Sequence, residues 1–455
     1  MNIVFIVVDT LRGDRVGCYG YWRPNISPNM DRIAAEGLLF KDAYASGIAT
    51  GPGFTCLHTG LNCVHHGFYL TPWNKPNTIN FDDTIPVAAD FFRDAGYVTA
   101  AVDNLMNFMG PMKHMVRGYN YYMNSSRQSG PQHHFVIADE VNAMALPWIR
   151  AHARNGHRPF FLFIHYWDTH APYNHPEPFR NYYHHEKNSL EGLPTVHAKA
   201  GYDYVPGWGP AHLIDEGDKY FDYYGPGAKG HDLYDEEVRY VDHAIGQVYE
   251  TLAEMGILDE TCIVITSDHG EALGEHDYWD HKYLDQATTH IPLIIRYPKS
   301  LPQGVALSGF TQQVDILPTM LDLAGIEGTA ARFDGQSLFA RIRGEATARS
   351  YAFVEGGGNV TFGRALLEDG WKLITYTDGS APQLYNLQDD PREIVNLAEA
   401  EPTKLKSMLD RLDRLVAQML DGRPDPIPRF DGDGAAPTRR QSQPQAAMGA
   451  TGRTR

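Results

Sequence analysis

The chain has 455 residues, of which 43% are hydrophobic, so it can bury the core of one large domain and a smaller one. Its net charge of −17 argues against a nucleic-acid partner, and no apolar run approaches the length that spans a membrane. The four cysteines do not indicate a disulfide framework, and a strand expected from residue 2 leaves no room for a signal peptide. We therefore expect a cytoplasmic protein with neither a nucleic-acid nor a membrane partner, and a homo-oligomer stays open.

The first expected strand covers residues 3–8 and ends directly before Asp9. A short, unbroken run of apolar and β-branched residues is typical of a buried parallel strand. A second run of this kind, residues 262–266, leads to Asp268 and His269. Since ligands gather beyond the carboxyl ends of parallel strands, we expect Asp9, Asp268 and His269 to share one cation. The alternative is that these polar residues only cap helices or turns.

Residues 50–60 predict the start of a helix beside this cation. Thr50 suits an N-cap and Pro52 tolerates a first turn, so a helix is expected to begin near Phe54. The N-terminus of a helix favours a bound anion. A metal ion beside the Thr50 hydroxyl would lower its pKa and make it a nucleophile. The alternative is a plain capped helix start.

Helical spacing alternates with apolar strands, which predicts an α/β fold with a mostly parallel central sheet flanked by helices. The expected helices cover residues 27–36, 85–95, 139–153 and 236–255. Two long segments rich in aromatic residues, about 107–135 and 174–232, interrupt this alternation. We interpret them as insertions that line a substrate pocket, pack on themselves or contact another subunit.

Near residue 349 the pattern changes to short strands, which predicts a smaller C-terminal α+β subdomain with an antiparallel sheet. Its expected strands are residues 351–355, 363–368, 371–377 and 383–387, with Asp369-Gly370 as a hairpin turn and residues 403–419 as a closing helix. The predicted division is therefore a large domain in residues 1–348, the subdomain in 349–423, and a disordered tail in 424–455.

Several motifs, in their order along the chain, resemble those of one protein family. They are Asn2–Gly20, Leu57–Gly60, Pro159–Tyr173, Tyr240–Asp242, Thr266–Glu271, Leu273–His276, Ile291–Pro298, Leu384–Pro391 and Asn396–Leu397. Over residues 1–425 the chain is similar to the sulfatase branch of the alkaline phosphatase superfamily. Its site pattern most resembles that of phosphonate monoester hydrolases and phosphodiesterases. The resemblance implies an alkaline-phosphatase-like fold with a sulfatase-like catalytic domain in residues 1–348.

Position by position, the resemblance implies roles for individual residues. Asp9, Asp268 and His269 fall on the metal ligands of the family, and Thr50 falls on the nucleophile, which also binds the metal. His170 falls on the histidine that contacts the ester and protonates the leaving group.

Two further positions are implied in binding the anionic oxygens of the ester. Lys282 falls on the lysine that holds these oxygens. Many sulfatases continue after the equivalent of residues 96–101 with Gly-Lys-Trp-His, whose Lys and His bind sulfate, whereas this chain reads Val102-Asp-Asn-Leu105. The site is therefore expected to have lost positive charge, with Asn104 left to donate a hydrogen bond. Thr10 stands where many sulfatases carry a second aspartate.

The position of the nucleophile departs from the sulfatase pattern. Sulfatases carry Cys or Ser in a C-x-P-x-R signature, and this residue is oxidised to formylglycine. The same five positions here read Thr50-Gly-Pro52-Gly-Phe54. Threonine is a secondary alcohol that cannot become an aldehyde by that route, and the arginine is absent. We therefore predict no formylglycine.

The predicted cofactor is one divalent metal ion. Calcium prefers oxygen ligands throughout, whereas the nitrogen of His269 favours Mn, Zn or Fe over Ca. A second metal would need a further set of ligands, for which Asp168, His170, His276 and His281 are available. We expect one metal, because Asp168-Thr-His170 resembles the substrate loop of sulfatases.

The predicted activity is metal-dependent hydrolysis of a small anionic ester, a phosphodiester or a phosphonate monoester, through a covalent phosphothreonine at Thr50. Three alternatives stay open. The first is a sulfuric ester hydrolase that acts without formylglycine. The second is a phosphotransferase, and the third is a metal-binding pseudoenzyme.

Overall fold

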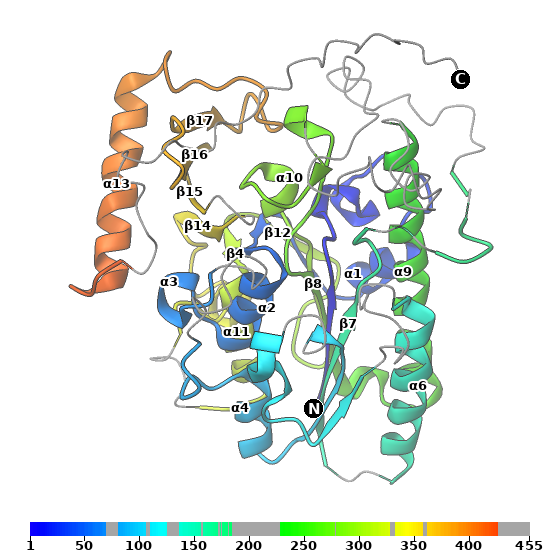
Figure 1. Ribbon diagram of the computed structural model, residues 1–455. Helices are drawn as coiled ribbons and strands as arrows, with labels where there is room; N and C mark the ends of the chain where they lie inside the picture. The colour runs from blue at the N-terminus through cyan, green and yellow to red at the C-terminus, as the bar shows by residue number, and fades with distance from the viewer. Residues whose placement is uncertain are drawn as a thin grey trace, which may run out of the picture.

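A large sheet forms the centre of the protein, as Figure 1 shows for the computed structural model. The structure describes residues 1–69, 81–105, 110–124, 136–155, 158–171, 173, 175–180, 182–183, 228–277, 279–327, 333–357 and 362–425. The eight strands, in spatial order, are β12 (Val305–Leu307), β2 (Leu38–Phe40), β11 (Leu293–Arg296), β8 (Thr261–Ser267), β1 (Asn2–Val8), β7 (Phe160–Tyr166), β5 (Val98–Val102) and β6 (Tyr121–Met123). Only β11 runs against its two neighbours, so the predicted mostly parallel sheet is confirmed.

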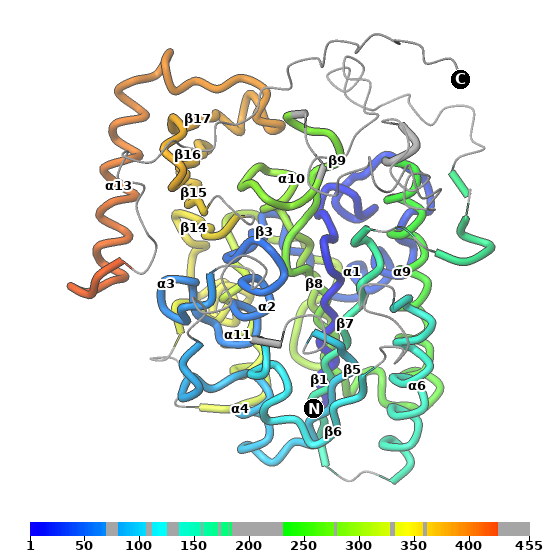
Figure 2. Tube along the Cα trace, viewed as in Figure 1, coloured from blue at the N-terminus to red at the C-terminus, as the bar shows by residue number. Residues whose placement is uncertain are grey.

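The middle strands of this sheet are apolar because both faces are covered by helices, and β1, β7 and β8 are buried almost throughout. One side carries α1 (Pro28–Ala35), α6 (Ala138–Asn155) and α9 (Ala228–Glu254), and the other carries α2 (Thr50–Thr59), α4 (Ala88–Asp94) and α11 (Ile316–Leu323). The tube in Figure 2 shows β1 between β7 and β8, with the chain on both sides of it. The N-terminal strand is therefore the core of the fold.

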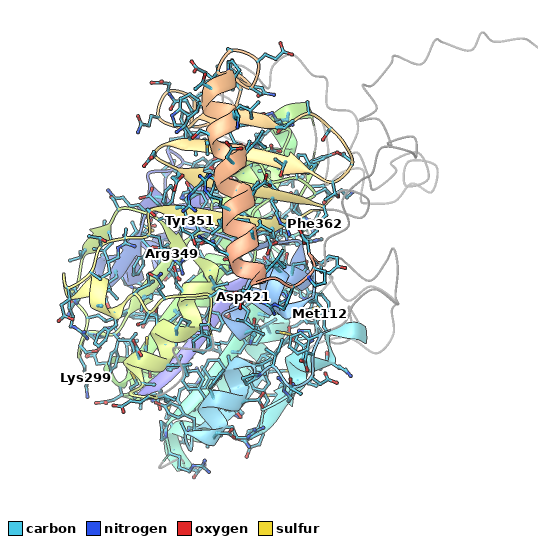
Figure 3. All side chains as sticks on the ribbon, turned by 90° about the vertical axis from the view of Figure 1, so that its left-hand side faces the viewer. Met112, Lys299, Arg349, Tyr351, Phe362 and Asp421 are labelled. Atoms are coloured by element: carbon cyan, nitrogen blue, oxygen red, sulfur yellow. The ribbon has the colours of Figure 1, made fainter. Side chains whose placement is uncertain are left out.

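A second sheet of five strands lies in the C-terminal part. It consists of β17 (Gln383–Asn386), β16 (Trp371–Tyr376), β15 (Gly363–Glu368), β14 (Tyr351–Gly356) and β4 (Gly47–Ile48). The four C-terminal strands are antiparallel, and their hairpin turn has left-handed backbone at Asp369 (φ 53°) and Gly370 (φ 79°), as Asp-Gly favours. The last helix, α13 (Pro402–Leu420), packs along this sheet (Figure 3).

One strand of the C-terminal sheet comes from the N-terminal part of the chain. β4 pairs in parallel with β14, with Gly47 opposite Glu355 and Ile48 opposite Gly356. This pairing was not predicted, because a strand of two residues carries no pattern. The predicted division at residue 348 stays a prediction.

Short elements complete the described chain. They are two small sheets, β9 (Ala272–Leu273) with β10 (Trp279–Asp280) and β3 (Ala43–Tyr44) with β13 (Thr311–Gln312), the helices α3 (Cys63–His66), α10 (Gln286–Thr289) and α12 (Phe339–Ile342), and the 3-10 turns Gly13–Arg15, Gly17–Tyr19, Gly110–Val116, Leu258–Glu260, Glu275–Asp277 and Gln313–Asp315. No helix among the described residues is long and apolar enough to cross a membrane.

The expected elements agree with the observed ones to within a few residues, with two exceptions. α9 begins at Ala228, eight residues before the predicted start at 236, so it extends into the predicted insertion 174–232. The predicted insertion 107–135 contains β6, the edge strand of the large sheet. The remainder of both insertions, and the predicted tail beyond residue 425, lie largely outside the described residues.

Candidate metal and ester site

The carboxyl ends of β1 and β8 bring Asp9, Asp268 and His269 together. The two strands are parallel neighbours with Val8 opposite Ser267, so the residues that follow leave the sheet at the same edge. All three side chains are fully buried, and one ligand atom of each lies within 4.8 Å of the others.

Several polar atoms of this cluster have no hydrogen-bond partner among the described residues. They are both carboxylate oxygens of Asp9, Oδ2 of Asp268 and Nε2 of His269. Nδ1–H of His269 donates to the carbonyl of Gly270 at 2.9 Å, which leaves the lone pair of the neutral ring on Nε2, 3.2 Å from Asp268 Oδ2. Burial above all, with the nearby His281, lowers the pKa of His269 to about 3 and keeps the ring neutral.

This arrangement fits a divalent cation. A ring lone pair and a carboxylate oxygen that face each other in a buried space repel unless a cation lies between them. Burial and the charge of Asp9 also raise the pKa of Asp268 well above its ordinary value, which is the cost of two carboxylates sharing one site. A bound cation would remove both penalties.

The first turn of α2 packs on this cluster. Thr50 is already helical and only 3% exposed, and Ala49 before it has a left-handed φ of 74°. Gly53 lies so close that an added Cβ would be 2.8 Å from the carbonyl oxygen of Asp268. The ring of Phe54 contacts His165 at a centroid distance of 4.6 Å.

The predicted start of this helix is therefore wrong by four residues. Thr50 is the first residue of α2, not its cap, and no side-chain capping bond is made at Ala49. The left-handed backbone at Ala49 sets the direction in which the helix begins. Strained backbone of this kind concentrates at functional sites.

Gly53→Ala should lower activity at least tenfold, because the new methyl group meets backbone and pushes the first turn of α2 away from Asp268. Gly246→Ala in α9 is the matched control, since its methyl group would meet only the side chain of Asn29, away from the cluster. Steady-state kinetics and melting curves of both variants check this. Equal activity of the two alanine variants would contradict the close packing at Gly53.

His170 reaches the same cluster from the loop after β7. Burial alone would raise the pKa of Asp9, but the nearby His165, with Nε2 3.5 Å from Asp9, and the charges of His170 and His269 lower it, so His170 is an electrostatic neighbour of Asp9. Nδ1 of His170 donates to the carbonyl of Ala171, which fixes the ring. His170 thus lies beside the cluster, and its contact with the ester stays a prediction.

Asn104 lies close to this loop, and its hydrogen bond to a substrate stays a prediction. It is 1% exposed, and its side-chain oxygen accepts a hydrogen bond from the indole N–H of Trp167. The Trp167 ring in turn makes an edge contact with His170 at a centroid distance of 5.8 Å. Asn104 therefore supports the position of the loop that carries His170.

His281, rather than its neighbour Lys282, contacts the cluster. The His281 ring stacks on His269 at a centroid distance of 4.4 Å and lies 5.3 Å from the ring of His170. Lys282 forms an ion pair with Asp280 at 2.6 Å, and its side chain is 29% exposed. Burial lowers the pKa of His281, but Glu271 and Asp280 outweigh it and raise this pKa to about 9. The group that supplies positive charge to the cluster at this point is thus His281.

His165 is a second site residue that sequence reasoning missed. It extends from β7, fully buried, with Nδ1 2.8 Å from Asp103 and Nε2 3.5 Å from Asp9. Burial opposes its protonation, but Asp103 and Asp9 raise its pKa to about 9. His165 thus brings a cation beside Asp103, which stands where many sulfatases carry a lysine, and the net loss of positive charge at the site stays a prediction. The pairing of Val102 with Ile164 places Asp103 beside His165, and this register is the signal that would have found it.

Thr10 positions Asp268 rather than joining it as a ligand. Its backbone N–H donates to Asp268 Oδ1 at 3.1 Å, and its hydroxyl lies 3.2 Å from that of Thr169. Of the residues considered for a second metal, His170 and His281 are near the cluster, whereas His276 lies with Asp285 and Glu393.

Asp168 points to α9, in a buried group that also holds His175. Nε2 of His175 is 2.9 Å from Glu236, and its Nδ1 is 3.0 Å from Glu237. Burial and the charge of Glu237 raise the pKa of Asp168 well above its ordinary value. This group holds the end of the loop that carries His170 against the helix.

His175→Gln should destabilise the protein by roughly 2–3 kcal/mol at pH 6, because it removes the cation between two buried carboxylates. Burial alone lowers the pKa of His175, but Glu237 and Glu236 raise it to about 9, above its unfolded value. The stabilisation is therefore complete below pH about 6.5 and is lost as the pH rises through 9. Urea unfolding of both proteins from pH 6 to 9 checks this, with His152→Gln on α6 as the control. A difference in the free energy of unfolding between wild type and His175→Gln that stays the same from pH 6 to 9 would contradict this prediction.

The fold and the site together define an α/β protein with a mostly parallel central sheet and a buried metal-type cluster at the strand ends. A family model described as Sulfatase matches residues 1–326, and one described as N-sulphoglucosamine sulphohydrolase, C-terminal, matches residues 274–419. The chain belongs to the sulfatase family.

Relatives along most of the chain carry sulfatase names. An N-acetylglucosamine-6-O-sulfatase of Bacteroides thetaiotaomicron is 26% identical over 93% of this chain and 88% of its own length. An arylsulfatase K of Xenopus laevis is 25% identical over 86% of this chain and 77% of its own length.

Solved structures share the fold. BT4656, solved in complex with its substrate D-glucosamine-2-N,6-O-disulfate, has a TM-score of 0.72 at 23% identity and covers 93% of this chain and 99% of its own. The phosphonate monoester hydrolase of Agrobacterium radiobacter has a TM-score of 0.69 at 19% identity and covers 92% of this chain and 95% of its own. At these identities both show the fold alone.

The prediction of a phosphodiester or phosphonate monoester hydrolase is wrong. The family model and the named relatives point to a sulfatase instead, and they support a hydrolase that acts on ester bonds. The threonine at position 50 is a single residue that favours phosphorus esters, whereas the match to sulfatases extends over most of the chain.

Proposed function

We propose that the protein hydrolyses sulfuric esters of small molecules with the unmodified hydroxyl of Thr50 as nucleophile. The observation that carries this is the position of Thr50, in a helix turn packed on the Asp9–Asp268–His269 cluster of a sulfatase-family chain. A helix N-terminus beside a cation site favours a sulfate group, which carries negative charge.

Asp9, Asp268, His269 and the Thr50 hydroxyl would hold one divalent metal ion, and its imidazole ligand favours Mn, Zn or Fe over Ca. When bound, such an ion lowers the pKa of the nucleophilic hydroxyl and stabilises negative charge on the ester oxygens. The orphaned buried atoms of the three cluster residues support this assignment.

The chain's own residues carry two balanced steps. Thr50 Oγ1, which has lost its proton to solvent, attacks sulfur while the S–O bond to the leaving group breaks, and His170 gives a proton to the departing alkoxide. His170 then takes a proton from the water that attacks the sulfothreonine, the bond between sulfur and Thr50 Oγ1 breaks, and hydrogen sulfate leaves. His281, held beside Glu271 and Asp280, would bind the non-bridging oxygens, and Lys282 acts through Asp280. His165, between Asp103 and Asp9, would hold Asp9 in its ionised form.

A panel of nitrophenyl sulfate, phosphate, bis-nitrophenyl phosphate and phosphonate esters tests this proposal. The expected result is sulfate release at a higher kcat/KM than turnover of any phosphorus ester. Sulfated amino sugars belong in the panel, because relatives carry names that refer to them. Turnover of phosphorus esters with no sulfate release would overturn the proposal.

A further inference from the structure

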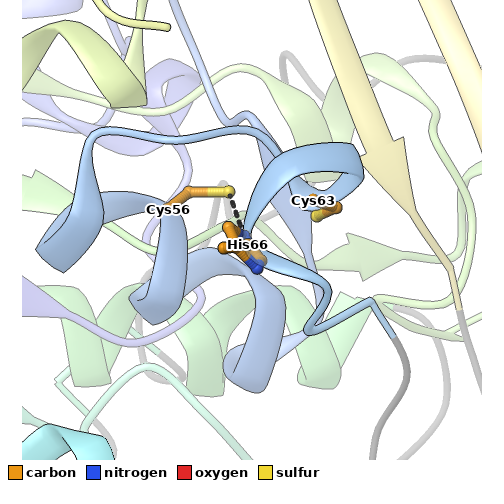
Figure 4. A group of neighbouring side chains, drawn as sticks. All are labelled: Cys56, Cys63 and His66. Carbon is orange, nitrogen blue, oxygen red and sulfur yellow. Dashed lines mark hydrogen bonds between the residues drawn. The ribbon is translucent and has the colours of Figure 1, made fainter. Parts of the chain in front are cut away.

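A buried group of two cysteines and a histidine lies outside the ester site, between α2 and α3 (Figure 4). Cys56 comes from the end of α2, and Cys63 and His66 come from α3. Both cysteines are fully buried, and His66 is 1% exposed. The sulfur atoms and a ring nitrogen all lie within 4.8 Å of one another.

The hydrogen bonds of His66 distinguish between a metal site and a thiol pair. The backbone N–H of Phe68 donates to Nδ1 of His66 at 3.0 Å, so Nδ1 carries no hydrogen. Burial lowers the pKa of His66 well below its ordinary value, so the ring is neutral and its proton is on Nε2. Nε2–H therefore donates to Cys56 Sγ, 3.3 Å away.

A metal ion would need the lone pair that this proton occupies. Histidine ligands of metals donate their other ring N–H to an acceptor, whereas here the other nitrogen already accepts a backbone N–H. Metal binding would thus require an imidazolate ring. The geometry favours two thiols with one hydrogen-bond donor.

The two thiols are not equivalent. Cys56 accepts the N–H of His66, and this contact stabilises negative charge on its sulfur. Burial and the neighbouring Cys56 raise the pKa of Cys63 well above its ordinary value, so it stays protonated until it reacts. Tyr69, which is only partly buried, packs against the pair.

We propose that Cys56 and Cys63 are an oxidisable dithiol that closes to a disulfide with a hydroperoxide. The Cys56 thiolate attacks the O–O bond of hydrogen peroxide, which gives the sulfenic acid and, after proton transfer, water. Cys63 then attacks the Cys56 sulfur, forms the S–S bond and releases a second water. Two thiols are oxidised and one peroxide is reduced to two waters.

The disulfide would join two helices that matter for the fold. α2 carries Thr50 at its other end, and α3 binds α13 through His65, whose Nε2 is 2.7 Å from the carbonyl of Met419. Closing this short loop restricts the unfolded chain, so the oxidised protein should melt on the order of 3 °C higher.

Mass spectrometry of the full chain after treatment with hydrogen peroxide and then an alkylating agent tests the proposal. The expected product is a peptide with Cys56 and Cys63 that has lost two hydrogen atoms and regains them with dithiothreitol. Cys56→Ser and Cys63→Ser should each abolish it. His66→Leu should slow its formation roughly tenfold and His66→Gln, which keeps an N–H donor, should slow it less.

Three outcomes would overturn the proposal. One is a native protein in which Cys56 and Cys63 stay reduced while the more exposed Cys18 is oxidised. Another is a disulfide of different pairing. The third is a drop of one metal equivalent in Cys63→Ser relative to the wild type, which would show a metal site. These readouts require no ester hydrolysis, so they hold whether or not the proposed function does.

Discussion

Thr50→Ala should lower kcat/KM for nitrophenyl sulfate by a factor of about 10³ or more. The variant removes the only atom of this side chain that can attack sulfur, while the first turn of α2 stays in place on Asp268. Alanine is also a good helix former, so melting curves should change little. Steady-state and single-turnover kinetics measure the effect.

Two variants make this test specific. Thr50→Ser keeps a hydroxyl and should stay within about tenfold of the wild type. Thr55→Ala, one turn further along α2, removes an equally buried hydroxyl that donates to the carbonyl of Gly51 at 2.7 Å. It should lose stability but keep most activity. Full activity of Thr50→Ala would refute the nucleophile.

Removal of metal by a chelator should abolish activity and lower the melting temperature. The ion is expected to hold together Asp9, Asp268 and the lone pair of His269, which otherwise repel in a buried space. Activity should fall by about 10³-fold and return with Mn or Zn. Calorimetry with and without chelator, together with metal analysis, measures both effects.

In Asp9→Asn the chelator should change neither the activity nor the melting temperature, because the variant cannot hold the ion tightly in the first place. Asp334→Asn is the matched control. It removes a partly buried carboxylate that binds His65 at 2.7 Å, far from the cluster in sequence, and should leave the chelator effects unchanged. An untreated wild-type protein that contains no metal and is fully active would contradict the metal assignment.

The sequence predicted those parts of the site that follow from strand ends. Asp9 and Asp268 could be placed together because each follows an apolar run, and parallel strands end at one edge. The hairpin at Asp369-Gly370 was also predictable from local sequence. Its turn needs left-handed backbone at two successive residues, and Asp-Gly is one of the few pairs that adopt it.

The parts that failed depend on pairings between distant segments. His165 could be assigned only after the register of β5 and β7 placed Asp103 beside it. Lys282 and His281 are adjacent in sequence, and their carboxylate partners differ: Lys282 pairs with Asp280, whereas His281 contacts both Glu271 and Asp280. Motif matching cannot resolve such a choice.

The pairing of β4 with β14 has a consequence for the order in which the protein matures. The strand that leads into Thr50 is hydrogen-bonded to residues more than three hundred positions later, at Glu355 and Gly356. During synthesis, β4 can form this pairing only after β14 has left the ribosome. A chain that ends before β14 would therefore contain Asp9, Asp268 and His269, while the strand that leads into Thr50 would lack its partner.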